Sequence, residues 1–130
     1  MNQYMQSAIL TASPEKLVQM LYERVIDLVK EAISKIDDIE SRNASLVRAE
    51  EIVLYLNSVL DMSKGGEISK NLRALYDFIY RQLIDGNING DVEKLEIARD
   101  FLQEMLDTWK EASKHVSVHP PSKNGFSISV

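Results

Sequence analysis

Apolar residues recur at spacings of three and four along four stretches of the chain, a pattern that predicts amphipathic helices. The first helix begins at Ser13-Pro14, because a serine can accept a backbone N–H and a proline suits the first helical position. Its apolar face continues to about Ile39. The second helix is expected to start at Asn43 and to end at Gly65-Gly66, since glycine adopts the left-handed geometry of a helix C-cap without strain.

Two more helices follow. The third starts near Glu67, and the segment Asp85–Gly90 is predicted to be a loop, after which Asp91 caps the fourth helix. The fourth helix has the most regular apolar stripe in the chain: Leu95, Ala98, Leu102, Met105, Trp109 and Ala112. This stripe places Trp109 in the core. Four helices of similar length with short connections predict an all-α fold, an antiparallel up-down-up-down four-helix bundle.

The sequence divides into three regions. Residues 1–13 form an uncharged, apolar N-terminal arm, residues 14–114 the helical bundle domain, and residues 115–130 a polar, irregular tail. The tail contains Pro120-Pro121, which interrupts any helix.

Composition limits the classes of function. The chain has 130 residues, enough for one buried core, and no cysteine, which excludes disulfides and thiolate metal sites. Its net charge of −5 argues against a nucleic-acid partner, which requires clustered positive charge. No apolar run is long enough for membrane insertion, and the arm lacks the basic start of a secretory signal. We therefore expect a cytoplasmic protein.

One short motif resembles a metal site. Asp85-x-Asn87-x-Asn89-Gly90 followed by Glu96 has the spacing of a calcium-binding EF-hand loop. The helices of an EF-hand diverge, whereas this segment is expected to reverse the chain between antiparallel helices. We favour a simple turn, and keep a calcium-dependent helical switch as an alternative.

The chain lacks the usual catalytic equipment. The two histidines, His115 and His119, lie in the predicted tail, so the predicted bundle offers no histidine for a di-iron site. The acidic pairs Asp37-Asp38 and Glu50-Glu51 fall on predicted solvated surfaces, and no glycine-rich phosphate loop is present. We expect no catalytic residue, no metal site and no cofactor, which favours a binding protein over an enzyme.

Several linked motifs resemble the flagellin-specific export chaperones, the FliS family. They occur in order along most of the chain: Thr11–Leu17, Met20–Tyr22, Leu60–Met62, Gly65–Ile68, Asn71-Leu72, Leu75–Asp77, Arg81-x-Leu83 and Asp107–Trp109. The resemblance implies a helical bundle that binds the disordered C-terminal segment of flagellin and keeps it monomeric and competent for export. It also implies that the N-terminal arm covers part of the binding surface until flagellin displaces it.

The candidate flagellin-binding residues are apolar residues near these motifs: Tyr4, Ile9, Leu10, Leu17, Met20, Tyr22, Leu60, Met62, Leu72, Leu75 and Tyr76. Some of them are expected to belong to the core. A helical adaptor that binds another component of the flagellar export apparatus stays open as an alternative function.

Overall fold

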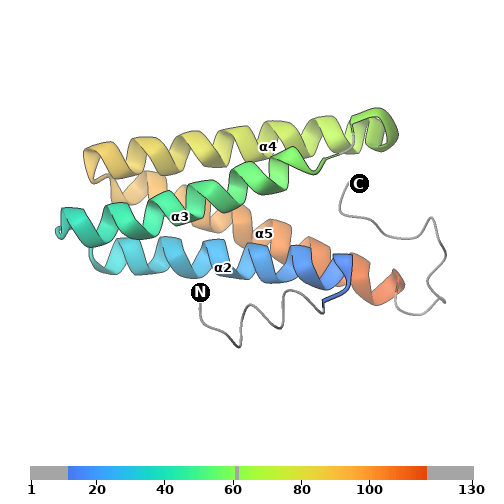
Figure 1. Ribbon diagram of the computed structural model, residues 1–130, viewed down its shortest axis with the longest axis horizontal. Coiled ribbons are helices and arrows are strands. Elements are labelled where there is room, and N and C mark those ends of the chain that lie inside the picture. The colour runs from blue at the N-terminus through green and yellow to red at the C-terminus, as the bar shows by residue number, and fades with distance from the viewer. Residues whose placement is uncertain (1–11, 61, 117–130) are drawn as a thin grey trace.

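The described residues form a bundle of four long helices. The computed structural model describes residues 12–60 and 62–116, and of these all side chains except those of residues 62–64, 115 and 116. The helices are α2 (Pro14–Ser34), α3 (Ile39–Ser58), α4 (Met62–Asn89) and α5 (Val92–Val116). Each packs against the helices before and after it, and α5 returns to pack against α2 (Figure 1). This arrangement confirms the predicted up-down-up-down four-helix bundle.

Helix α2 starts where the sequence predicts and ends earlier. The Ser13 hydroxyl accepts a hydrogen bond from the Lys16 backbone N–H at 3.3 Å, and Pro14 occupies the first turn. The helix stops at Ser34, so the predicted extension to Ile39 is wrong. Ile36 still packs against the core from the turn that follows, which explains why the apolar period outlasts the helix.

Asp38, not the predicted Asn43, caps α3. One carboxylate oxygen of Asp38 accepts the Ser41 backbone N–H at 3.2 Å, and the other accepts the Ser41 hydroxyl at 2.9 Å. These hydrogen bonds, led by the backbone one, hold the pKa of Asp38 below its ordinary value. Asn43 lies within α3, where its side-chain oxygen accepts the Asn87 amide of α4 at 2.9 Å.

The glycine pair does not end α3 as predicted, because α3 already stops at Ser58. The pair lies inside α4, where Gly66 has a φ of 55° and kinks the helix. The straight part of α4 follows that kink and runs to Asn89, so the predicted loop Asp85–Gly90 is mostly helical. Gly90 makes the turn with a φ of 61°. Asp91 then accepts the Lys94 backbone N–H at 3.4 Å, which confirms the predicted cap.

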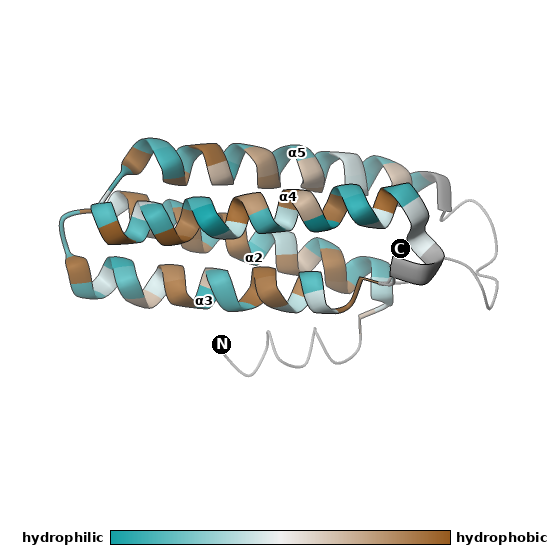
Figure 2. Cartoon of the chain, turned by 90° about the horizontal axis from the view of Figure 1, so that it is seen from above, coloured by the Kyte–Doolittle hydropathy of each residue, from teal (hydrophilic) through white to brown (hydrophobic). Residues whose placement is uncertain are grey.

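The core lies along the axis of the bundle, and apolar and polar residues alternate around each helix (Figure 2). Leu95, Ala98 and Leu102 of the predicted stripe are completely buried. Helices α4 and α5 approach closely at Gly86, where a Cβ atom would lie 2.5 Å from a methyl carbon of Leu95. Within residues 12–60 and 62–116, no helix combines the length and apolar character that a membrane crossing requires.

Arg42 joins three segments at one end of the bundle. Its guanidinium donates to the Ile36 carbonyl at 2.6 Å, to the Asn87 carbonyl at 2.8 Å and to the Asn87 side chain at 3.3 Å. Arg42 is only 8% exposed. The bidentate geometry ties the turn after α2 to the last turn of α4.

Candidate functional site

An apolar groove of about 630 Å³ runs between α4 and α5, and we call it the α4–α5 groove. Its volume falls in the range of ligand-binding clefts. Glu104 is the one charged residue among the described residues that line it. The lining consists of Tyr22, Ile68, Leu72, Leu75, Phe101, Glu104, Met105, Thr108, Trp109 and Ala112.

Three aromatic residues from three helices meet at the base of the groove: Tyr22 and Trp109 line it, and the buried Tyr76 supports them from inside. The hydroxyls of Tyr22 on α2 and Tyr76 on α4 are 2.6 Å apart and share a hydrogen bond. Trp109 on α5 packs edge-on against Tyr22, with ring centroids 6.3 Å apart. The Trp109 indole N–H donates to the Glu15 carbonyl of α2 at 2.9 Å. These contacts fix the position of α5 against the start of α2.

The base of the groove carries no charge at neutral pH. Burial raises the pKa of the Tyr22 hydroxyl, despite the opposing effect of its hydrogen bond to Tyr76. Burial also raises the pKa of Tyr76, with a further contribution from Tyr22. Both hydroxyls stay protonated and satisfy each other. The base of the groove therefore offers a neutral surface to a ligand, and Glu104 is the charged residue among the described lining.

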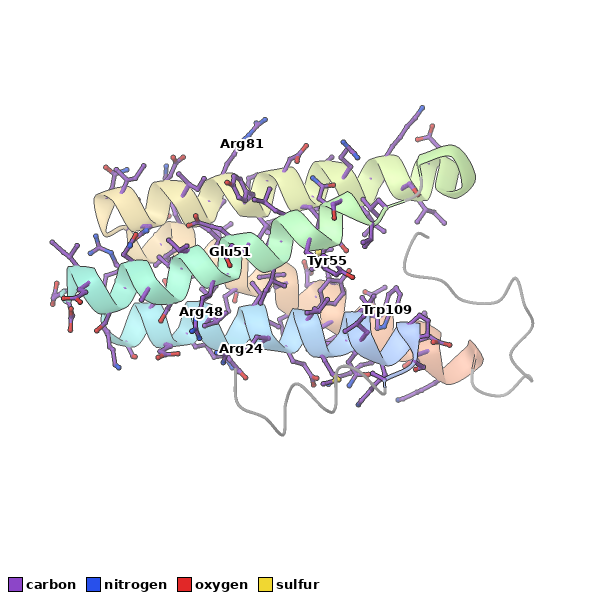
Figure 3. All side chains as sticks on the ribbon, in the orientation of Figure 1. Arg24, Arg48, Glu51, Tyr55, Arg81 and Trp109 are labelled. Atoms are coloured by element: carbon purple, nitrogen blue, oxygen red, sulfur yellow. The ribbon has the colours of Figure 1, made fainter. Side chains whose placement is uncertain are left out.

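Trp109 was predicted to lie in the core, and the structure places it at the core boundary. It packs against the buried cluster and is only partly buried, because it also lines the α4–α5 groove. Figure 3 shows Trp109 beside the first turns of α2. The stripe of apolar residues spaced three and four apart identifies the apolar face of the helix. It does not show at which residue the neighbouring helices cease to cover that face. Ala112, at the end of the same stripe, is exposed.

The predicted binding residues fall in several environments. Tyr22, Leu72 and Leu75 line the α4–α5 groove. Tyr76 and Leu60 are buried, at 3% and 8% exposure. Leu17 and Met20 are half-buried on α2. Met62 is the first residue of α4, and its side chain is outside the described part. Tyr4, Ile9 and Leu10 lie outside the described residues.

The sequence reasoning missed Phe101 and Met105 as groove residues. Phe101 packs edge-on against Phe78 of α4, with centroids 5.2 Å apart, and forms one wall. The position of Phe101 directly before the stripe residue Leu102 could have identified it from the sequence, because a residue at the edge of a core stripe lies near the neighbouring helix. Met105 was assigned to the core stripe only.

A second hollow of about 600 Å³ lies over α2 and α5 and is basic; we call it the basic hollow. It has a partly apolar floor. Its described lining is Lys16, Met20, Glu23, Arg24, Ile26, Asp27, Lys30, Gln103, Leu106 and Lys110. It shares α5 with the α4–α5 groove but lies on the α2 side of that helix.

The segment with calcium-site spacing is mostly helical. Asp85 and Asn89 lie in the last turns of α4, where the Asn89 amide donates to the Asp85 carbonyl at 3.1 Å. Lys94 lies 3.6 Å from the Asp85 carboxylate, and Glu96 pairs with Arg99 at 3.9 Å. In the described part of the chain, no three acidic or histidine side chains gather in a way suited to a metal ion. This geometry favours the turn over the calcium loop.

The described residues therefore define an all-α protein, a four-helix bundle with an apolar groove between two of its helices. Comparison with known proteins gives the family: the sequence model of the flagellar protein FliS family matches residues 1–116, and the chain belongs to this family.

Curated relatives have similar lengths and names. The flagellar secretion chaperone FliS of Bacillus subtilis (strain 168) is 33% identical over 111 residues, which cover 84% of this chain and 82% of the relative. The flagellar secretion chaperone FliS of Salmonella typhimurium is 31% identical over 115 residues, covering 86% and 85%. That of Vibrio cholerae is 33% identical over 107 residues, covering 81% and 79%.

Proposed function

We propose that the protein is a cytoplasmic chaperone, not an enzyme, that binds the disordered C-terminal segment of flagellin. Binding prevents premature polymerisation and keeps flagellin competent for type III flagellar export. Membership of a family of secretion chaperones supports the class of function. The observation that carries the proposal is the α4–α5 groove, an apolar surface on a bundle that is otherwise rich in charged residues.

The mechanism is coupled folding and binding. A disordered segment with apolar residues at helical spacing folds into a helix as these residues bind in the groove. The bound apolar residues can then no longer contact other chains. Ordering such a segment costs about 2–5 kcal/mol, so the groove has to supply substantial apolar contact. Ile68, Leu72 and Leu75 from α4 face Met105 and Trp109 from α5 and provide that contact.

We assign the binding of flagellin to the α4–α5 groove, with Tyr22 at its base. The half-buried Leu17 on α2 extends the surface around the bundle, whereas Met20, also predicted as a binding residue, lines the basic hollow instead. The buried Tyr76 and Leu60 support the groove from inside.

The N-terminal arm is the proposed competitor for the groove. Helix α2 begins at Pro14, next to the Trp109–Glu15 hydrogen bond, so the arm joins the bundle beside a groove wall. Residues 1–13 carry no charged side chain, and therefore Tyr4, Ile9 and Leu10 can cover apolar surface without burying a charge.

Deleting residues 1–10 is expected to tighten the binding of a flagellin C-terminal peptide, since the arm-covered fraction no longer reduces the apparent affinity. The same deletion exposes apolar surface and promotes self-association of the free chaperone. The dissociation constants of both proteins are compared by calorimetry, after sedimentation has verified that the truncated protein is monomeric. Weaker binding after the deletion would place the arm within the binding surface instead, and unchanged binding would remove it from the mechanism.

The direct test of the function is a pull-down with full-length flagellin and with flagellin that lacks its C-terminal segment. Capture of the full-length protein alone supports the proposal. Equal capture of both would contradict it, and capture of neither would favour the alternative adaptor, which binds a folded domain of another flagellar export component.

A further inference from the structure

The basic hollow carries an excess of positive charge that the proposed function does not use. Four cations and two carboxylates line it, although the whole chain has a net charge of −5. Met20, Ile26 and Leu106 form the apolar part of its lining. Positive charge is thus concentrated around an apolar floor on a protein that is acidic overall.

Of these four cations, only Lys110 has an ionic partner within the described part of the chain. Lys110 lies 3.8 Å from Glu23, and both side chains are partly exposed. Among the described residues, no carboxylate lies within ion-pair distance of Lys16, Arg24 or Lys30. Their positive charge is available to a ligand.

A fifth cation, Arg48, lies on the neighbouring helix α3 and does not itself line the hollow. Arg24 lies ten residues before the end of α2 and Arg48 nine residues after the start of α3. In an antiparallel pair both are therefore about 14–15 Å from the turn, at the same level. In the view of Figure 3, Arg24 of α2 and Arg48 of α3 lie at a similar level along the bundle, whereas Arg81 of α4 points away from them.

We propose that the basic hollow binds a second protein partner, through an amphipathic helix that bears carboxylates along its edge and apolar side chains on its face. The carboxylates pair with Arg24, Lys30 and Lys16, and the apolar side chains contact Met20 and Leu106. Charge complementarity of this kind raises the association rate and selects the partner. The carboxylates of Glu23 and Asp27 in the same lining disfavour a nucleic-acid backbone, which they would repel.

The proposal places the acidic side chains on another molecule. Residues 1–11 and 117–130 contain neither aspartate nor glutamate, so these two segments supply no acidic side chain to the hollow. The basic hollow lies on the α2 side of α5 and the α4–α5 groove on the other side. Both surfaces can be occupied together, and the proposal does not depend on what fills the groove.

The test uses the full chain and a short synthetic amphipathic helix with leucine on one face and glutamate on the other, labelled for fluorescence anisotropy. A matched peptide has lysine in place of every glutamate. We expect the glutamate peptide to bind, with an affinity that falls as salt is added, and the lysine peptide not to bind. The double variant Arg24→Gln/Lys30→Gln weakens binding about fivefold, the effect of removing two partly exposed charge pairs.

Arg81→Gln is the matched control, because Arg81 is an exposed arginine on α4 outside the hollow, and it leaves the affinity unchanged. Equal binding of the lysine peptide, or equal weakening by Arg81→Gln, would overturn the proposal. Two further outcomes would also overturn it. If heparin competes with the peptide while Met20→Ser has no effect on binding, the hollow is a general anion site. If the protein self-associates and Arg24→Gln abolishes this self-association, the hollow binds a second copy of the chain.

Discussion

The hydroxyls of Tyr22 and Tyr76 show how a pair of single residues maintains the base of the groove. They come from helices on opposite corners of the bundle and meet at 2.6 Å inside it. A buried hydroxyl without a partner is costly, while a pair that satisfies itself is not. The pair therefore fixes the relative position of α2 and α4 beneath the groove.

Tyr22→Phe is expected to lower the free energy of unfolding by about 1–3 kcal/mol, since it leaves the Tyr76 hydroxyl buried without its partner. The double variant Tyr22→Phe/Tyr76→Phe recovers most of this loss, because no hydroxyl is left unsatisfied. Urea denaturation of the two single variants and the double variant measures the coupling. Additive losses in the double variant would show that the two hydroxyls do not depend on each other.

Glu50 on α3 is a half-buried carboxylate, and its covered Oε2 atom has no hydrogen-bond partner among the described residues. Burial raises its pKa, and the neighbouring Glu51 raises it further. The folded state therefore binds this proton more tightly than the unfolded state does. The contribution to stability is present at low pH and is lost as the pH rises through the folded pKa.

Glu50→Gln is accordingly expected to raise the Tm at pH 7. The gain disappears below the ordinary glutamate pKa of about 4.3, where the carboxyl is protonated in both states. Glu51→Gln, at an exposed position on the same helix, gives a smaller gain. Thermal denaturation across this pH range measures the effect, and a gain of equal size at every pH would refute the assignment to ionisation.

At the scale of the elements, the helix ends depend on competition between neighbouring signals. The apolar period of the first helix extends to Ile39, but Asp38 starts α3 and leaves Ile39 69% exposed. The apolar period alone does not show which residue caps the next helix. A carboxylate that accepts two hydrogen bonds favours a new helix start more strongly than one apolar residue favours continuing the preceding helix. For the same reason Gly66 marks a kink and not an end, since α3 has already stopped at Ser58.

Arg42→Lys is expected to lower the free energy of unfolding by about 2 kcal/mol, because a lysine cannot reproduce the forked contacts to the carbonyls of Ile36 and Asn87. Arg48→Lys, at an exposed position on the same helix, changes stability by less than about 0.5 kcal/mol. Urea unfolding compares the two variants. Equal stability of both would mean that the buried guanidinium contributes no more than a surface cation.

At the scale of the whole molecule, the fold could be predicted from the sequence because each helix carries its own apolar stripe. The site could be predicted only in part. Leu72 and Leu75 were identified, whereas Phe101 and Met105 were not. The groove brings residues from the first half of α4 opposite residues that come mostly from the second half of α5, and the apolar period within each helix does not show which residues of the two helices face each other. Two surfaces on either side of α5 emerge only when the bundle is assembled.

The α4–α5 groove can be tested with two isoleucines on the same helix. Ile68 is 58% exposed and lines the groove, while Ile88 is 72% exposed and lies at the other end of α4, outside it. Aspartate at either position leaves the core intact, because both side chains are largely in solvent. The two substitutions therefore differ in their position relative to the groove.

Isothermal titration of the isolated flagellin C-terminal peptide into the wild-type protein, Ile68→Asp and Ile88→Asp is the most direct measurement. Saturable binding with a negative heat-capacity change is expected for the wild type, because apolar surface is buried. Ile68→Asp weakens the affinity about tenfold or more, since a charge replaces an apolar contact in the groove, and Ile88→Asp leaves it unchanged. No binding by the wild-type protein, or equal affinities of the wild type and Ile68→Asp, would contradict the assignment of flagellin to the α4–α5 groove.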